Sequence, residues 1–175
     1  MLERLVHSVE SYDSLKKSID SWDLKPYESY VGFIDNLTMN AMLGSQDPVF
    51  QKYALMSRSM PVNYVQDSSS VASVCIENND ISLNINPVNA IALTENEDQV
   101  LFIIAHEMKH VLLGHLKRYV DVLKDQTVQV ILNIALDYEV NEGLAREVLQ
   151  MGSTSCIPNN MICRKNIRDF TGNTE

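Results

Sequence analysis

The chain has little of what marks the unusual protein classes. Its 175 residues include only 6 glycines and 5 prolines, while 45% are hydrophobic, which excludes collagen-like and disordered chains. The longest unbroken apolar run, residues 100–105, is far shorter than the roughly 20 residues that a membrane-spanning helix needs. Length and apolar content therefore predict a single domain over residues 1–175 with its own hydrophobic core.

Basic residues and cysteines are also scarce. The chain has 14 Lys and Arg against 23 Asp and Glu, a net charge of −9, so we expect neither nucleic acid nor an anionic membrane as its main partner. The first residues, MLERLVHSVESYDS, lack the basic and apolar regions of a secretory signal. Cys75, Cys156 and Cys163 cannot all pair with one another, and none lies in a CxxC motif. Reduced thiols are typical of cytoplasmic proteins, and we expect this localisation.

Apolar periodicity predicts helices in the N-terminal part of the chain, residues 1–60. The expected helices cover residues 2–22, 27–41 and 47–56, with Trp22 on the buried face of the first. Residues 61–160 begin with a possible strand at 62–65. Two alternating segments, 71–77 and 81–86, then flank Asn78-Asn79-Asp80, which predicts a β-hairpin and hence a small antiparallel sheet.

Two long helices are expected after the hairpin. Thr94-Glu95-Asn96-Glu97 has the form of a capping box, which predicts a helix that starts there and runs through His106 and His115 to about residue 122. A second helix is expected from about 126 to 150, and residues 161–175 are a tail. The predicted fold class is α+β: N-terminal helices, a small sheet, and the His106 helix packed on the second long helix.

The first of these helices contains an HExxH motif, His106 to His110. Residues four apart lie on the same face of a helix, so His106 and His110 can bind one Zn²⁺. Glu107 lies about 100° around the axis, where its carboxylate can act as a general base on water. Apolar residues surround this helix, which predicts that it is buried, and buried polar groups need partners. The alternative is a pair of core histidines with a salt-bridged glutamate.

A catalytic zinc site needs a third protein ligand besides water. On an uninterrupted helix His115 falls about 180° from His106, which leaves it a packing role or a local hydrogen bond. The second long helix offers a better candidate, Asp137, in a stripe at i+4 spacing with Asn133 and Asn141. The same face carries four apolar residues and is expected to be buried: Val130, Ile134, Leu144 and Val148.

A carboxylate centred in an apolar stripe is rarely left unpaired, which favours Asp137 as a metal ligand. Asn133 and Asn141 are then expected to hydrogen-bond to the ligands. Glu139 is the runner-up third ligand, but it falls on the opposite, solvated face. A buried polar network without metal is the alternative reading of the stripe.

Several spaced motifs between about residues 80 and 160 resemble the VWA-like metallopeptidases. The family carries a strand that ends in Asn-Pro, a polar helix cap, an HExxH helix that ends in His-x-x-Arg, an Asn-x-Ala-x-Asp-x-x-x-Asn helix and a Pro-containing turn. The matching residues are Asn86-Pro87, Thr94, His106–His110 with His115 and Arg118, Asn133 to Asp137 with Asn141, and Pro158. The resemblance implies a zincin-like fold and peptidase activity. Many members continue into a von Willebrand factor A-like domain where this chain ends, which implies a separate VWA-like or ATPase partner.

The sequence thus predicts a zinc-dependent metallopeptidase acting on a peptide or protein substrate. One Zn²⁺ per chain would be bound by His106, His110 and Asp137, with Glu107 as the general base. An edge of the 71–86 hairpin would pair with the extended substrate. A non-catalytic zinc domain and a metal-free acidic interaction protein are the alternatives. Glu107 argues against the first, and the buried polar stripe argues against the second.

Overall fold

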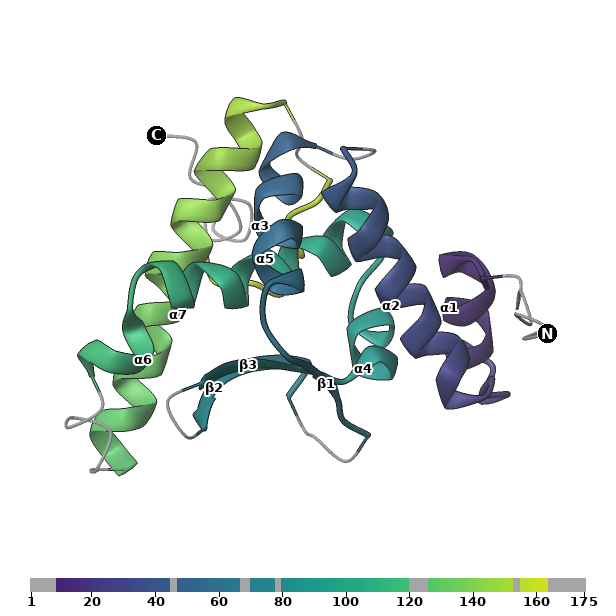
Figure 1. Cartoon of the computed structure of the whole chain (residues 1–175), viewed down its shortest axis with the longest axis horizontal. Helices are drawn as coiled ribbons and strands as arrows, with labels where there is room; N and C mark the ends of the chain where they lie inside the picture. Colours follow the sequence, from purple (N-terminus) through teal and green to yellow (C-terminus); the bar gives the residue numbers. More distant parts are fainter. Residues whose placement is uncertain are drawn as a thin grey trace.

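Helix α5, Glu97–Leu112, crosses the middle of the molecule, and the other elements are arranged around it (Figure 1). The computed structural model describes residues 9–44, 47–66, 70–77, 80–119, 126–152 and 155–163. Over these ranges the fold is α+β, as predicted. The other elements are α1 Tyr12–Asp20, α2 Tyr27–Met42, α3 Pro48–Arg58, β1 Val62–Tyr64, β2 Ala72–Glu77, β3 Asp80–Ile85, α4 Pro87–Ala92, α6 His115–Arg118 and α7 Gln126–Gln150. None of the helices in these ranges combines the length and the apolar character needed to cross a membrane.

The predicted N-terminal helices are found, with corrections at the first. Side chains cap α1 and α3, since Ser11 accepts a hydrogen bond from the Ser14 N–H and Asp47 accepts one from the Val49 N–H. Residues 1–8 of the predicted first helix lie outside the described residues. The prediction of a buried Trp22 is wrong, because its side chain is 92% exposed. Helix α1 has already ended, and Trp22 adopts a left-handed backbone conformation (φ 58°) that interrupts the helical periodicity.

The sheet has three strands in the order β1-β3-β2 and is mixed. Strands β2 and β3 form the predicted antiparallel hairpin, with Val74 opposite Leu83, although its turn at 78–79 lies outside the described residues. The expectation of a purely antiparallel sheet is wrong, because β1 pairs with β3 in parallel. Strand β2 forms the edge opposite β1. The hairpin then places β3 between them, antiparallel to β2 and parallel to β1.

The hydrophobic core lies around the first half of α5. All side chains from Val100 to Ala105 are buried, and the helix contacts α2, α3, α4, α7 and β2. A helix that is apolar on all sides requires such enclosure, as predicted. The burial extends into the HExxH motif, where Met108 is fully buried. The polar residues of the motif therefore project from a helix that the core holds in place.

Both ends of α5 differ from the prediction. The helix begins at Glu97, with the Asn96 side chain accepting a hydrogen bond from the Gln99 N–H. The Thr94 hydroxyl is instead buried and donates to the carbonyl of Ala90. The helix ends at Leu112 rather than near residue 122, because Gly114 adopts a left-handed conformation (φ 68°) that glycine tolerates best. Helix α6 then starts in a new direction.

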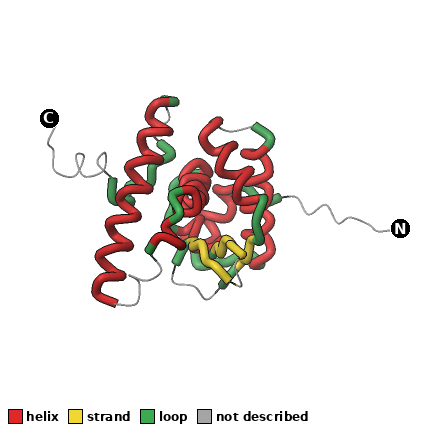
Figure 2. The backbone as a smooth tube through the Cα atoms, turned by 60° about the vertical axis from the view of Figure 1, so that its left-hand side comes forward, coloured by secondary structure: helices red, strands yellow, loops and turns green. Residues whose placement is uncertain are grey.

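Helix α7 has the predicted bounds but only half of the predicted buried face. Val140, Leu144 and Val148 are buried, whereas Val130 and Ile134 are 60% and 54% exposed. Asp137, expected at the centre of the buried face, has a side chain that is 52% exposed. Figure 2 shows α7 at one side of the molecule, flanking the other elements rather than being enclosed by them. Its second half packs against α5, and its first half extends past the core. A stripe that is continuous in the sequence is therefore divided between core and surface.

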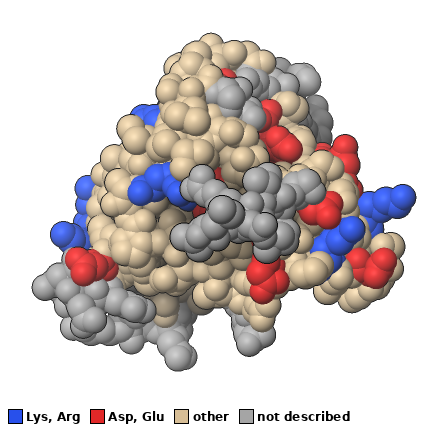
Figure 3. All heavy atoms as spheres, turned by 45° about the vertical axis from the view of Figure 1, so that its right-hand side comes forward, with Lys and Arg blue, Asp and Glu red and all other residues tan. Residues whose placement is uncertain are grey.

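Charged side chains of both signs are mixed on the surface that Figure 3 displays. The Lys and Arg side chains lie at the two sides of this view, separated by acidic groups and uncharged surface. The described part of this face therefore carries no continuous basic patch.

A charged cluster around Glu147 connects α3, α5 and α7. Lys109 Nζ lies 2.6 Å from Glu147 Oε1, and Lys52 Nζ lies 3.0 Å from Oε2. The Tyr53 hydroxyl also donates to this carboxylate. Gly143 makes room for Lys109, since a Cβ there would lie 2.6 Å from Lys109 Nζ. The cluster holds the second half of α7 against the HExxH helix.

We expect Glu147→Gln to lower the free energy of unfolding at pH 7 by about 1–2 kcal/mol, because it removes charge-assisted contacts of a nearly buried lysine. Burial raises the pKa of Glu147, but Lys109 and Lys52 outweigh this effect and leave the pKa below its ordinary value. The contribution of the Glu147 carboxylate to the free energy of unfolding is therefore present above the ordinary glutamate pKa. It is lost as the pH falls through the lower pKa of the folded state.

Urea unfolding at pH 7 and pH 3 measures the difference in free energy of unfolding between the parent protein and Glu147→Gln. This difference should be smaller at pH 3. Arg146→Gln is the control, because the Arg146 side chain is 63% exposed in its ion pair with Glu142 and its loss should cost at most about 0.5 kcal/mol. Equal losses for the two variants would contradict the role of the cluster.

Candidate metal centre

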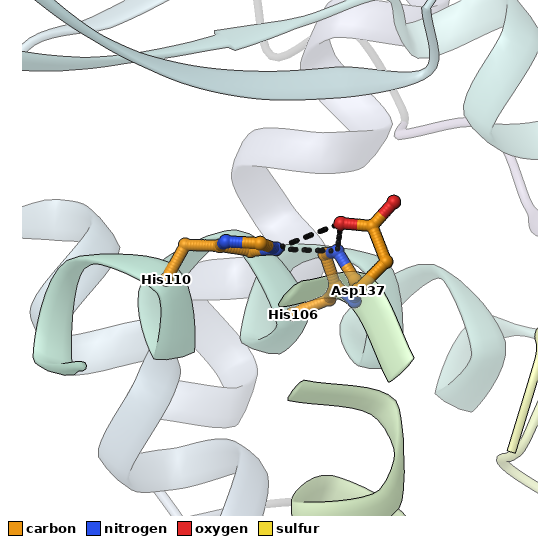
Figure 4. Close-up of side chains that lie close together, drawn as sticks. All are labelled: His106, His110 and Asp137. Carbon is orange, nitrogen blue, oxygen red and sulfur yellow. Dashed lines mark hydrogen bonds and ion pairs between the residues drawn. The ribbon is translucent and has the colours of Figure 1, made fainter. Parts of the chain in front are cut away.

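The structure brings together the three side chains predicted to be metal ligands. His106 and His110 project from one face of α5, and Asp137 reaches them from α7 (Figure 4). The Nε2 atoms of the two histidines are 3.0 Å apart. Asp137 Oδ1 lies 3.6 Å from His106 Nε2 and 3.2 Å from His110 Nε2. The predicted proximity is confirmed, and the ligand role remains a prediction.

These distances fit a single small cation. Zinc binds imidazole nitrogen and carboxylate oxygen at about 2.0–2.2 Å in tetrahedral sites, which separates neighbouring ligand atoms by about 3.3–3.5 Å. The three observed separations, 3.0, 3.2 and 3.6 Å, lie around this value. Two imidazoles and one carboxylate also suit zinc chemically, and they leave a fourth position for water or substrate.

Asn141 fixes the orientation of His106. Its Oδ1 lies 2.7 Å from His106 Nδ1, and its amide nitrogen donates to the carbonyl of Ile162. The amide oxygen therefore accepts the Nδ1 proton, which leaves Nε2, the atom that faces Asp137, available to a cation. The expected role of Asn141 matches this contact. Asn133 makes no such contact. Its side chain is exposed, and no hydrogen bond described for this structure joins Asn133 to the cluster.

The charge of Asp137 is favoured by its neighbours. Burial raises the pKa of its carboxyl group, but the hydrogen bonds and charges of His106 and His110 outweigh burial and hold the pKa well below its ordinary value. Burial lowers the pKa of His106, and Asp137 and Glu107 more than reverse this. The anionic carboxylate is the form that binds a cation, whereas the raised pKa of His106 means that a cation has to displace a proton from that ring.

Glu107 is held by a backbone group of the sheet. Its Oε2 accepts a hydrogen bond of 3.0 Å from the N–H of Val74, in the middle of β2. Burial raises the pKa of the Glu107 carboxyl, and the two histidines and the Val74 N–H partly oppose this. A raised pKa brings a carboxylate closer to the range in which it both takes and returns protons near neutral pH.

A cleft of about 350 Å³ contains His106, Glu107, Asp137 and Asn141. Residues 71–72, before and at the start of β2, form one wall, and α7 and residues 158–162 form another. The other described residues of the lining are mostly apolar and include no Lys or Arg: Val71, Ala72, Leu93, Ile103, Ile134, Pro158, Asn160, Met161 and Ile162. The polar groups of the cleft are thus concentrated at one place in an apolar surround.

His115 lies in contact with the cluster, which the sequence reasoning missed. Its Nδ1 is 3.0 Å from Nδ1 of His110, and its side chain is buried. The angular count assumed an unbroken helix, whereas the left-handed Gly114 turns the chain and returns His115 toward α5. Glu139, the runner-up ligand, lies with its Oε2 3.6 Å from Nε2 of His115. Gly114 was the signal in the sequence that could have indicated this bend.

Comparison of the chain with protein-family models, with curated proteins and with solved structures gives no match. The resemblance to VWA-like metallopeptidases therefore rests on the sequence motifs alone.

We expect the protein to bind about one zinc ion per chain, and Asp137→Ala to weaken that binding more than about 100-fold, since it removes a ligand. Asn141→Ala should cost about 10–100-fold, which is typical of groups that orient ligands. Titration against a chromophoric chelator measures affinity. Elemental analysis reports the metal present, including iron, which the same donor set can bind.

Asn133→Ala is the matched control on α7 and should leave zinc affinity unchanged. If Asp137→Ala retained affinity and Glu139→Ala abolished it, the third ligand would be Glu139 and the assignment of Asp137 would be wrong.

Proposed function

We propose that the protein is a zinc-dependent metallopeptidase with a zincin-like arrangement of its active-site helix. The observation that carries the proposal is the triangle of His106, His110 and Asp137, with His106, Asp137 and Glu107 lining one cleft. A metal-binding triangle alone fits many proteins. A carboxylate that lies beside it without belonging to it is the additional group that hydrolysis requires.

Each group of the cleft has a distinct task in this proposal. His106, His110 and Asp137 hold the ion, which when bound lowers the pKa of water and polarises a carbonyl group. Glu107 takes the proton of the attacking water and passes it to the nitrogen of the leaving amine. The Val74 N–H keeps the Glu107 carboxylate at the wall of the cleft, and burial keeps its pKa high enough for it to return the proton.

The walls of the cleft favour an extended peptide as the substrate. Strand β2 is an edge strand in the order β1-β3-β2, and its Val74 N–H is directed at Glu107 rather than at β3. Alternate residues of β2 therefore present backbone groups on the side away from β3, where a peptide can pair. Among the described residues the lining is mostly apolar and holds no Lys or Arg, which favours uncharged side chains around the cleaved bond.

Two other functions are less well supported. A purely structural zinc site has no use for Glu107, whose carboxylate costs free energy to bury and accepts a hydrogen bond from Val74 of β2. A metal-free interaction domain leaves two imidazoles and a carboxylate converging without a ligand. A separate VWA-like or ATPase partner, implied by the resemblance, and a cytoplasmic location, expected from the cysteines, belong to the same proposal.

We expect Glu107→Gln to retain zinc and to lower the rate of peptide hydrolysis by about 10²–10⁴-fold, because it removes proton transfer without removing a ligand. The measurement is cleavage of a fluorogenic library of uncharged peptides by the zinc-loaded protein, with zinc content determined on the same samples.

Glu28→Gln, an exposed change on α2, is the control and should leave the rate unchanged. Cleavage that continues at the normal rate in Glu107→Gln would exclude Glu107 as the base. Zinc binding by the parent protein without cleavage of any peptide in the library would favour the structural zinc site.

A further inference from the structure

His115 contacts the metal centre from outside the ligand triangle. Helix α5 ends at Leu112, and the left-handed Gly114 starts α6 in a direction that brings His115 back to His110. The two rings lie edge to face, with centroids 5.0 Å apart and planes at 77°. Their Nδ1 atoms are 3.0 Å apart, and only 3% of His115 is exposed. The contact is thus a partly buried hydrogen bond between two imidazoles.

The geometry separates this role from that of a ligand. His110 directs its Nε2 atom at His106 and Asp137, at 3.0 and 3.2 Å. It meets His115 through the other ring nitrogen, Nδ1. The two nitrogens of an imidazole are directed away from each other, so His115 lies on the side of the His110 ring opposite the triangle.

The protons of the two rings can be assigned from the hydrogen-bond partners. A histidine that gives the Nε2 lone pair to a metal carries its proton on Nδ1 and needs an acceptor there. For His106 the acceptor is Asn141 Oδ1. For His110 the atom in the equivalent place is His115 Nδ1, which accepts only when the His115 proton is on Nε2.

The remaining nitrogen of His115 is directed toward a carboxylate. His115 Nε2 is buried and has no hydrogen-bond partner within the described ranges. The carboxylate oxygen Oε2 of Glu139 lies 3.6 Å away, just beyond hydrogen-bond distance, on an exposed side chain that can move closer. Glu139 therefore favours the tautomer in which Nε2 carries the proton and Nδ1 remains an acceptor.

We propose that His115 is a positioning residue of the zinc site: it accepts the Nδ1 proton of His110 and fixes the Nε2 lone pair of that ring toward the ion, with Glu139 supporting its tautomer. This inference rests on the proposed zinc function. It gives His110 the kind of partner that Asn141 gives His106, so that both histidine ligands are oriented by a hydrogen bond.

The test compares two substitutions of nearly equal shape. His115→Leu removes the acceptor, and we expect zinc affinity to fall by about 10–100-fold, as for other partners of metal-ligating histidines. His115→Asn places an amide oxygen close to where Nδ1 was, so it should restore most of that affinity. Glu139→Gln should weaken binding less than His115→Leu does. Lys117→Gln, an exposed change on α6, is the control and should have no effect.

Affinity is measured by chelator competition on the full chain, with circular dichroism of the metal-free variants to verify folding. Long-range ¹H–¹⁵N NMR of the zinc-loaded protein should show the His110 proton on Nδ1 and the His115 proton on Nε2. If His115→Leu does not fold, the zinc affinity of His115→Asn and the tautomers observed by NMR test the role of His115.

The possible failures can be told apart. No zinc binding by the parent protein would overturn the proposed function, and this inference with it. Normal zinc binding that His115→Leu leaves unchanged, or a His115 proton on Nδ1, would overturn the role of His115 alone.

Discussion

The burial of α5 is the constraint on which the rest of the structure depends. Six consecutive apolar side chains, Val100 to Ala105, are enclosed on all sides, and the polar residues of the motif follow directly after them. Polar groups at the border of a core cost free energy unless they find partners. Here the partners come from three directions: β2 binds Glu107, α7 binds His106 and Lys109, and α6 binds His110. The candidate site consists of these compensating contacts.

The sequence predicted the parts of this arrangement that follow from helical geometry. The pairing of His106 with His110 depends only on i+4 spacing, and the Asp137 stripe depends on the same spacing in a second helix. Because both helices are present over the residues concerned, the side chains met as expected. The hairpin was also predictable, since its alternating apolar residues and polar turn lie within one short segment.

The predictions that were wrong concern contacts or bends that the spacing of apolar residues does not indicate. One left-handed glycine, Gly114, ended a helix that apolar spacing would have continued, and it changed the position of His115. The apolar stripe of α7 carries no mark of where the core ends, so Val130 and Asn133 were placed inside it. Helix α4 was missed although Asn86 and Pro87 occupy its cap and first position, a recognisable start signal. The parallel pairing of β1 depends on the order of strands in space.

The contact between Glu107 and Val74 has a consequence for the behaviour of the protein at high concentration. An unpaired strand edge is a template for pairing with other chains, and proteins protect such edges with charges or by covering them. Strand β2 is an edge strand, and Glu107 both occupies one of its free N–H groups and places a buried carboxylate beside it. A second copy, like a substrate peptide, can therefore pair only with the backbone groups of this edge that lie on either side of Val74. The same side chain thus limits the length over which two copies of the chain can associate through β2.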